Sequence, residues 1–278
     1  MRQSRRSMPA RSGAAIVALM KDYSPGHVIA PHAHDRDQLV YATRGVMTVT
    51  TREGSWIVPT HRAVWIPAGV AHSVAMSGSV QMRTLYLRPR TAKTLPQVCC
   101  VVVVSALLRE LILAACRTGS LERRIPWQRH LADTILDQLR SLELLPLRLP
   151  NPRDPRAARI AQALVADPGD DRPLERLCRI SGASKRTIER LFVEQVGMSV
   201  GRWRQQLRLM HAMRLLAAGS KVTHAALEAG YATPSAFIWM FRRQLGTTPG
   251  SWFRGHDPDR EGPTRLPTTR RARTRPWR

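Results

Sequence analysis

Three histidines and a glutamine in the first third of the chain have the side chains and the spacing of a metal site. His32, His34 and Gln38 share parity, so on one extended strand their side chains point to the same face. A Pro-Ala-Gly turn at residues 67–69 precedes His72, and a hairpin return through it would bring His72 to the other three. Three imidazoles and an oxygen suit zinc, iron, nickel or manganese. We therefore expect either a divalent metal at His32, His34, Gln38 and His72, or a metal-free pocket in which the histidines line a polar effector site.

A second set of residues with recognisable chemistry lies near the C-terminus, where one pattern occurs twice. In residues 174–192, and again in residues 222–241, a periodic apolar run reaches a glycine. A Ser or Thr follows (Ser184, Thr233), and a second periodic run ends in Phe. Glycine enters a turn conformation that costs other residues energy, and Ser or Thr caps the free amides of the next helix. Each segment therefore predicts a helix-turn-helix, whose second helix enters the DNA major groove.

The outward faces of the two second helices carry the side chains that would meet DNA. In the first unit, Ile188 and Leu191 are expected to pack inward, which leaves basic and polar side chains outside. Arginine donates two hydrogen bonds to guanine O6 and N7. Such a pair favours guanine over another base by about 1–3 kcal/mol of binding free energy. The alternative is a solvated basic face without a partner. The residues expected to face DNA are Ser184, Lys185, Arg186, Glu189 and Arg190 in the first unit and Ser235, Ile238, Trp239, Arg242 and Arg243 in the second.

The two units are not expected to contribute equally to sequence reading. In the second unit the outward face holds Ile238 and Trp239, which touch only apolar edges such as a thymine methyl, or sugar. Arg242 and Arg243 follow and would anchor the phosphate backbone. Base reading should therefore rest mainly on the first unit. For Trp239, packing against the helix between the units is the alternative.

The segment between the units predicts one amphipathic helix over residues 203–218, with Arg204 and Arg208 exposed. About sixteen residues at a rise of 1.5 Å span roughly 24 Å. With the flanking turns, this length suits two recognition helices one DNA turn apart, about 34 Å. In the first unit, Ile180 is expected to pack inward with the other apolar residues of its helix.

Composition and hydrophobic periodicity change along the chain and divide it into five segments. Short β-rich runs separated by Gly, Pro and polar turns predict strands up to about residue 88, and helical spacing follows from about residue 98. A Pro-rich stretch at residues 145–155 marks a linker. We expect a disordered basic arm (1–13), a β domain (14–90), a helical connector that could support dimerisation (91–150), the double helix-turn-helix domain (155–254) and a disordered basic tail (255–278).

Composition limits the class of protein. The chain has 278 residues, enough for two domains with cores of their own, and its net charge of +24 favours nucleic acid as a partner. Only four of the 44 basic residues are lysines, so the charge is supporting evidence alone. The four cysteines form no regular framework, which predicts reduced thiols. The longest apolar run is too short for a membrane span and no signal peptide is evident, so we expect a cytoplasmic protein without a membrane partner.

The doubled pattern resembles the DNA-binding domain of the AraC/XylS family of bacterial transcriptional regulators, in which a linker helix joins two such units. The resemblance keeps its spacing over residues 173–253. It implies that promoter or operator DNA is faced by Arg186, Glu189 and Arg190 in the first unit and by Pro234, Ser235, Ile238 and Trp239 in the second. It also implies RNA polymerase and a second copy of the chain as candidate partners, in activation or repression. One departure is Trp239, where the family often has a polar or basic residue. The matching residues are Ser184, Arg190, Leu191, Phe192, Gly197, Arg208, Ala212, Leu215, Leu216, Ala225, Gly230, Tyr231, Ser235, Phe237, Phe241, Arg242, Gly246 and Pro249.

The N-terminal segment resembles the two motifs of the cupin barrel, over roughly residues 16–88, and such a barrel is common in AraC-type regulators. Metal-binding cupins usually have Glu at Gln38 and Asn at Met76, and His61 replaces the glycine that opens the second motif. The resemblance implies an α+β multidomain fold: an N-terminal cupin-like β-barrel followed by helices, then an all-α double helix-turn-helix domain. The matching residues are Gly26, His32, His34, Gln38, Gly45, Pro67, Ala68, Gly69 and His72.

These features predict a sequence-specific transcriptional regulator, controlled by a small molecule or metal ion bound in the barrel, and not an enzyme. The alternative from another class is a cupin metalloenzyme, a dioxygenase or isomerase, fused to a DNA-binding module. Against it, the barrel motif lacks the glutamate ligand, and we name no catalytic residue. A third hypothesis, a sequence-independent nucleoid binder, follows from charge alone and predicts equal affinity for random and promoter DNA.

Overall fold

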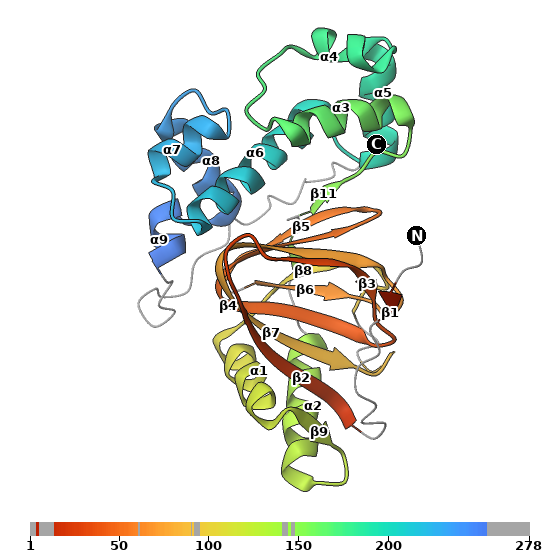
Figure 1. Cartoon of the computed structure of the whole chain (residues 1–278), viewed down its shortest axis with the longest axis vertical. Coiled ribbons are helices and arrows are strands. Elements are labelled where there is room, and N and C mark those ends of the chain that lie inside the picture. The colour runs from red at the N-terminus through yellow and green to blue at the C-terminus, as the bar shows by residue number, and fades with distance from the viewer. Residues whose placement is uncertain are drawn as a thin grey trace, which may run out of the picture.

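The computed structural model shows two domains, a β-barrel and a helical domain that packs against one side of it (Figure 1). The barrel fills the lower half of the view, with α1 and α2 beneath it and the helical domain above. The expected tail, 255–278, and most of the expected arm, 1–13, lie outside the described residues. The structure describes residues 4–5, 14–60, 62–89, 91, 95–140, 144–145 and 148–254.

The barrel is a strongly bent antiparallel sheet built around two long strands. These are β4 (Asp37–Thr51) and β7 (His72–Leu87), which pair along most of their length. Buried and less buried residues alternate along β7, as expected for a strand with one face inside. The remaining strands of the predicted β segment are β2 (Ala14–Tyr23), β3 (Val28–Ala33), β5 (Gly54–Val58) and β6 (Arg62–Ile66).

The sheet extends beyond the expected boundary at residue 90. In the expected helical connector, α1 (Ala106–Thr118) and α2 (Pro126–Arg140) are helices, but four short segments are strands of the sheet. The reason is that a short continuous apolar run also suits a strand covered on both faces. The strands are β8 (Cys100–Val103) beside β6, β9 (Ser120–Glu122) beside β2, β10 (Leu144–Leu145) beside β8 and β11 (Arg148–Pro150) beside β5.

Within the expected N-terminal arm, β1 (Ser4–Arg5) departs from the prediction of disorder. Its two residues pair in parallel with His32 and Ala33 of β3. Strand β3 offers an open edge there, and an extended dipeptide satisfies its backbone groups.

The helical domain contains both predicted helix-turn-helix units, α4–α5 and α7–α8. Gly182 ends α4 with φ of 66°, and the Ser184 side chain caps α5 by accepting a hydrogen bond from Thr187 N. Thr233 caps α8 in the same way. The helices are α3 (Pro155–Ala166), α4 (Leu174–Ser181), α5 (Lys185–Val196), α6 (Val200–Ala217), α7 (Val222–Glu228), α8 (Pro234–Leu245) and α9 (Pro249–Arg254).

Three details of the helical domain differ from the sequence predictions. Helix α6 begins at Val200 because Ser199 caps it, three residues before the expected start. The Arg208 guanidinium is not free in solvent but donates to the carbonyls of Pro168 (3.3 Å) and Asp170 (2.8 Å). Ile180 is 43% exposed, because short α4 buries Leu177, Cys178 and Ser181 instead.

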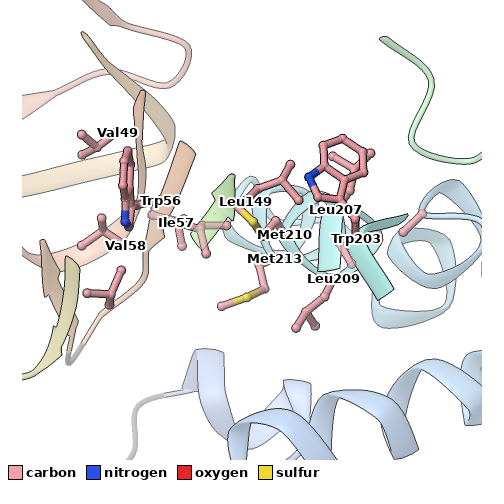
Figure 2. Close-up of a cluster of buried hydrophobic side chains, with 14 of the residues drawn as sticks. Val49, Trp56, Ile57, Val58, Leu149, Trp203, Leu207, Leu209, Met210 and Met213 are labelled. Carbon is pink, nitrogen blue, oxygen red and sulfur yellow. The ribbon is translucent and has the colours of Figure 1, made fainter. Parts of the chain in front are cut away.

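The two domains share one hydrophobic core, shown in Figure 2. Leu149 of β11 lies between Trp56 and Ile57 of the barrel and the side chains of α6. The buried Trp203 of α6 donates from Nε1 to the Pro150 carbonyl at 2.8 Å. Linker strand β11 is therefore part of the barrel sheet and also a packing partner of the helix that joins the two DNA-binding units.

Candidate functional site: a histidine cluster and a DNA-binding face

The three predicted histidines meet inside the barrel. His32 of β3 lies opposite His72, the first residue of β7, and their ring centroids are 4.4 Å apart. His34 follows directly after β3, and one ring nitrogen from each of the three lies within 4.8 Å of the others. All three side chains are buried. The sheet register thus brings together groups that are about forty residues apart in the chain.

Hydrogen bonds set the tautomers of two of these histidines. His32 Nδ1 lies 2.8 Å from the Ala30 carbonyl, and His72 Nδ1 lies 2.9 Å from the Val70 carbonyl. A carbonyl only accepts, so each Nδ1 carries a proton, and in the neutral ring the lone pair lies on Nε2. Burial lowers the pKa of His72 to about 4, which keeps its ring neutral at neutral pH.

Gln38, the predicted oxygen ligand, lies on β4, whereas His32 lies on β3, so the expectation that they share one strand was wrong. Gln38 Nε2 donates to the Tyr86 hydroxyl at 3.2 Å, and the Tyr86 ring packs edge-on against His34 with centroids 4.9 Å apart. Gln38 Oε1 and His72 Nε2 are both buried, and neither has a hydrogen-bond partner in the described part of the chain. Buried polar atoms of this kind are costly unless a ligand or ion satisfies them. The donor set therefore fits a bound metal or a polar ligand.

Tyr86 is a functional candidate that the sequence analysis missed. It has the same strand parity as His72 on β7, so its side chain points to the barrel interior with the histidines. That parity was visible in the sequence, but the bend of β7 and its pairing with β4 were not.

The first recognition helix, α5, presents all five predicted residues to solvent. Lys185 Nζ lies 2.8 Å from Glu175 Oε1, and the Arg190 guanidinium contacts both carboxylate oxygens of Glu194 at 2.9 and 3.1 Å. Ser184, Arg186 and Glu189 complete the exposed face. Glu194 had not been singled out, although acidic and basic residues four apart on a helix are a recognisable signal.

The second recognition helix, α8, also presents all five predicted residues to solvent. Trp239 is 61% exposed and does not pack into the linker helix, which was the alternative for this side chain. The Arg243 guanidinium lies over its ring, 5.2 Å from the centroid. Ser235, Ile238 and Arg242 lie on the same exposed surface. The exposed face of α8 therefore carries two apolar side chains, Ile238 and Trp239, next to two arginines, Arg242 and Arg243.

Family models match both domains. A model described as a helix-turn-helix domain matches residues 177–255, and one described as an AraC-like ligand binding domain matches residues 16–144. The chain is 34% identical over 245 residues to the HTH-type transcriptional regulator NimR of Escherichia coli, which is 88% of this chain and 89% of NimR. It is 38% identical over 107 residues to the regulator RipA of Corynebacterium glutamicum, which is 38% of this chain and 32% of RipA.

Among solved structures, ToxT from Vibrio cholerae aligns with 86% of this chain and 97% of its own, at 11% identity and a TM-score of 0.37. NimR and RipA are transcriptional regulators, in agreement with the prediction of a regulator rather than an enzyme. Within the described residues, no helix has both the length and the apolar character needed to cross a membrane.

Proposed function

This chain belongs to the AraC/XylS family of DNA-binding transcriptional regulators with a ligand-binding domain, and from that premise we propose how its two sites work. Helices α5 and α8 read double-stranded promoter DNA, and an effector bound at His32, His34 and His72 controls that reading. The observation that carries the proposal is the buried cluster of three histidines, whose nitrogens converge within 4.8 Å.

In the proposed complex, the first unit supplies most of the base reading. Arg186 and Arg190 have the planar donors that pair with guanine, and Lys185 and Ser184 lie at the N-terminus of α5, where phosphates bind. Glu189 accepts from cytosine N4. In the second unit, Ser235 bonds a base or phosphate and Ile238 and Trp239 contact thymine methyls or sugar. Arg242 and Arg243 anchor the backbone.

The effector is a divalent metal or a polar small molecule. The Nε2 lone pairs of His32 and His72, with a nitrogen of His34, would hold a metal, and the Gln38 amide oxygen is a candidate fourth ligand. A bound ion would satisfy His72 Nε2 and link β3 to β7, so its chemistry would be structural. Without an ion, the same groups would hydrogen-bond a polar small molecule.

Two protein partners complete the proposal. Helices α1 and α2 expose Leu107 (53%) and Trp127 (55%), two large apolar side chains suited to contact with a second copy of the chain. RNA polymerase is the proposed partner once the regulator is on DNA.

The function is tested by mapping the protein's binding sites across the genome and measuring affinity for the mapped fragments. We expect discrete sites upstream of genes, and stronger binding to those fragments than to random DNA of equal length at moderate salt. Equal affinity for both kinds of DNA would instead support the nucleoid-binder hypothesis. The genes next to the mapped sites would point to the effector.

The metal is tested by elemental analysis of protein purified without chelator. We expect about one divalent ion per chain, with the ion lost in His32→Ala and in His72→Ala. His130→Ala changes an exposed histidine on α2 and should leave the metal content unchanged. Unmodified protein that contains no metal and takes up none on dialysis would leave the small-molecule effector as the sole hypothesis.

A further inference from the structure

Arg208, in the middle of helix α6, holds the loop that leads into the first DNA-binding unit. This loop, residues 167–173, connects α3 to α4. The half-buried guanidinium donates to three successive backbone carbonyls of the loop: Pro168 at 3.3 Å, Gly169 at 3.4 Å and Asp170 at 2.8 Å. Arg208 therefore fixes the start of the first unit against the helix that joins both units.

The same guanidinium packs against the turn of the second unit. Gly230 lies between α7 and α8 with φ of 76°, and a Cβ built there would lie 2.9 Å from Arg208 Cζ. Glycine leaves room for the guanidinium at this turn, and it also adopts the positive φ without strain. The loop and the turn touch each other as well, because a Cβ at Gly169 would lie 3.1 Å from the Glu228 carbonyl oxygen. One side chain on α6 thus contacts both units.

Further hydrogen bonds fix the shape of the loop. The Asp170 carboxylate is buried, and it accepts from the backbone amide of Arg172 at 2.8 Å and from the Arg172 guanidinium at 2.7 Å. Arg204, one turn before Arg208 on α6, donates to the Arg172 carbonyl at 2.9 and 3.0 Å. The loop therefore presents its carbonyls in one arrangement, which suits the rigid, planar donors of an arginine better than the single charged nitrogen of a lysine.

The two units have little other contact with each other. Helix α6 runs between α3–α5 on one side and α7–α8 on the other (Figure 1). Within the described residues, neither α4 nor α5 packs extensively against α7 or α8. Two recognition helices that enter successive major grooves must lie one DNA turn apart, about 34 Å. The rotation of each unit about α6 therefore has to be set by contacts such as those of Arg208.

We propose that Arg208 is a positioning residue that sets the spacing and relative orientation of the recognition helices α5 and α8. This inference rests on the proposed reading of DNA by both helices, but Arg208 itself need not contact DNA. Loss of the guanidinium leaves each unit folded and lets the two units move relative to each other. Binding through both units then becomes weaker and less selective for half-site spacing, because the second unit is no longer held where its groove lies.

The first test measures the placement of the two units in the full-length protein without DNA. Spin labels carried by non-canonical amino acids at Val193 of α5 and Trp239 of α8, both exposed, report the distance between the units by pulsed electron paramagnetic resonance. We expect one narrow distance distribution for the wild type and a broader one for Arg208→Gln. Gly230→Ala should also broaden it, because the new methyl displaces the guanidinium, the flexible partner in this contact.

Two matched controls separate this effect from backbone strain and from loss of charge. Gly182 is the turn glycine of the first unit, with φ of 66°, and a Cβ there meets no atom within 4 Å. Gly182→Ala therefore carries similar strain without displacing an arginine. Arg202→Gln removes an exposed arginine from the same helix, α6. Both controls should keep the wild-type distribution. If Arg208→Gln and Gly230→Ala keep it too, the proposal is overturned.

The second test measures how DNA binding depends on half-site spacing, which a loss of stability alone would not change. One base pair inserted between the half-sites of a mapped binding site turns the second half-site by about 36°, and should raise the wild-type Kd about tenfold or more. For Arg208→Gln we expect this ratio of Kd values to fall to about threefold or less. Equal ratios for the two proteins would contradict the proposal. Absence of any specific binding site would instead count against the proposed function, and the DNA-free distances would still decide the role of Arg208.

Discussion

On the DNA-binding face, an exposed ion pair between Arg190 and Glu194 orients the arginine side chain. Both are about half exposed and form an ion pair one helical turn apart on α5. Exposed pairs of this kind contribute only about 0.3–0.5 kcal/mol to stability. Arg190 can therefore exchange Glu194 for a guanine at little cost, while Glu194 limits the orientations of the free side chain. The pair positions Arg190 rather than holding the helix together.

Substitution of Arg190 tests its role in reading bases. Arg190→Ala should lose about 1–3 kcal/mol of binding free energy on the preferred site and little on random DNA. Lys185→Ala is the contrast, because a phosphate contact should weaken binding to both DNAs alike and reduce the salt dependence. Titration of labelled fragments at several salt concentrations measures both effects. An equal loss on the two DNAs for Arg190→Ala would mean that Arg190 contacts phosphate alone.

At the scale of elements, α5 depends on its N-cap. Ser184 adopts an extended backbone, and its Oγ accepts from Thr187 N at 3.2 Å, at the start of a twelve-residue helix. Gly182 turns the chain just before it with a positive φ that other residues adopt at a cost. These two local features fix where the recognition helix begins, and hence which side chains face outward.

Removal of this cap should weaken the domain. We expect Ser184→Ala to lower the free energy of unfolding by about 1 kcal/mol. Ser184→Asp should restore it, because aspartate also caps helices and favours their N-termini. Ser235→Ala, within α8, is the control and should change stability little. Chemical denaturation followed by circular dichroism measures all three, and an unchanged Ser184→Ala variant would show that the cap contributes nothing.

At the scale of the whole molecule, the barrel and the DNA-binding domain are packed as one unit. The barrel strand β7 passes the C-terminal end of α6 so closely that a Cβ at Gly78 would lie 2.2 Å from the Ala217 carbonyl oxygen. Trp203 and Leu149 join the same shared core. Because α6 connects the two helix-turn-helix units, this contact joins the barrel directly to the helix on which both units depend.

Two glycine substitutions separate backbone strain from domain packing. Gly78 and Gly26 both have positive φ, but a Cβ at Gly26 meets no atom within 4 Å. Gly26→Ala should therefore cost about 1–2 kcal/mol through strain alone and keep a single unfolding transition. Gly78→Ala should in addition push β7 from α6 and split the transition in two, as seen by calorimetry. Identical behaviour of the two variants would argue against coupled domains.

The sequence by itself determined the double helix-turn-helix and its outward residues. Their signals are local: a glycine that turns the chain, a Ser or Thr that caps the next helix, and apolar residues at helical spacing. The ten residues expected to face DNA are exposed for that reason. The histidine set was readable only in part. Strand parity placed His32 and Gln38 on one strand, which was wrong because the chain turns between β3 and β4, but the three predicted histidines do meet in the barrel.

Only the tertiary structure decided how distant parts of the chain pair and pack. Strand β8 lies in a valine-rich run that reads equally well as part of a helix, and its pairing with β6 settles it. Arg208 looks like a solvent-exposed helix residue until the loop at Pro168 and Asp170 folds over it. The shared core joins segments about a hundred residues apart, such as Trp56 of β5 and Leu149 of β11, and no local pattern encodes contacts of that range.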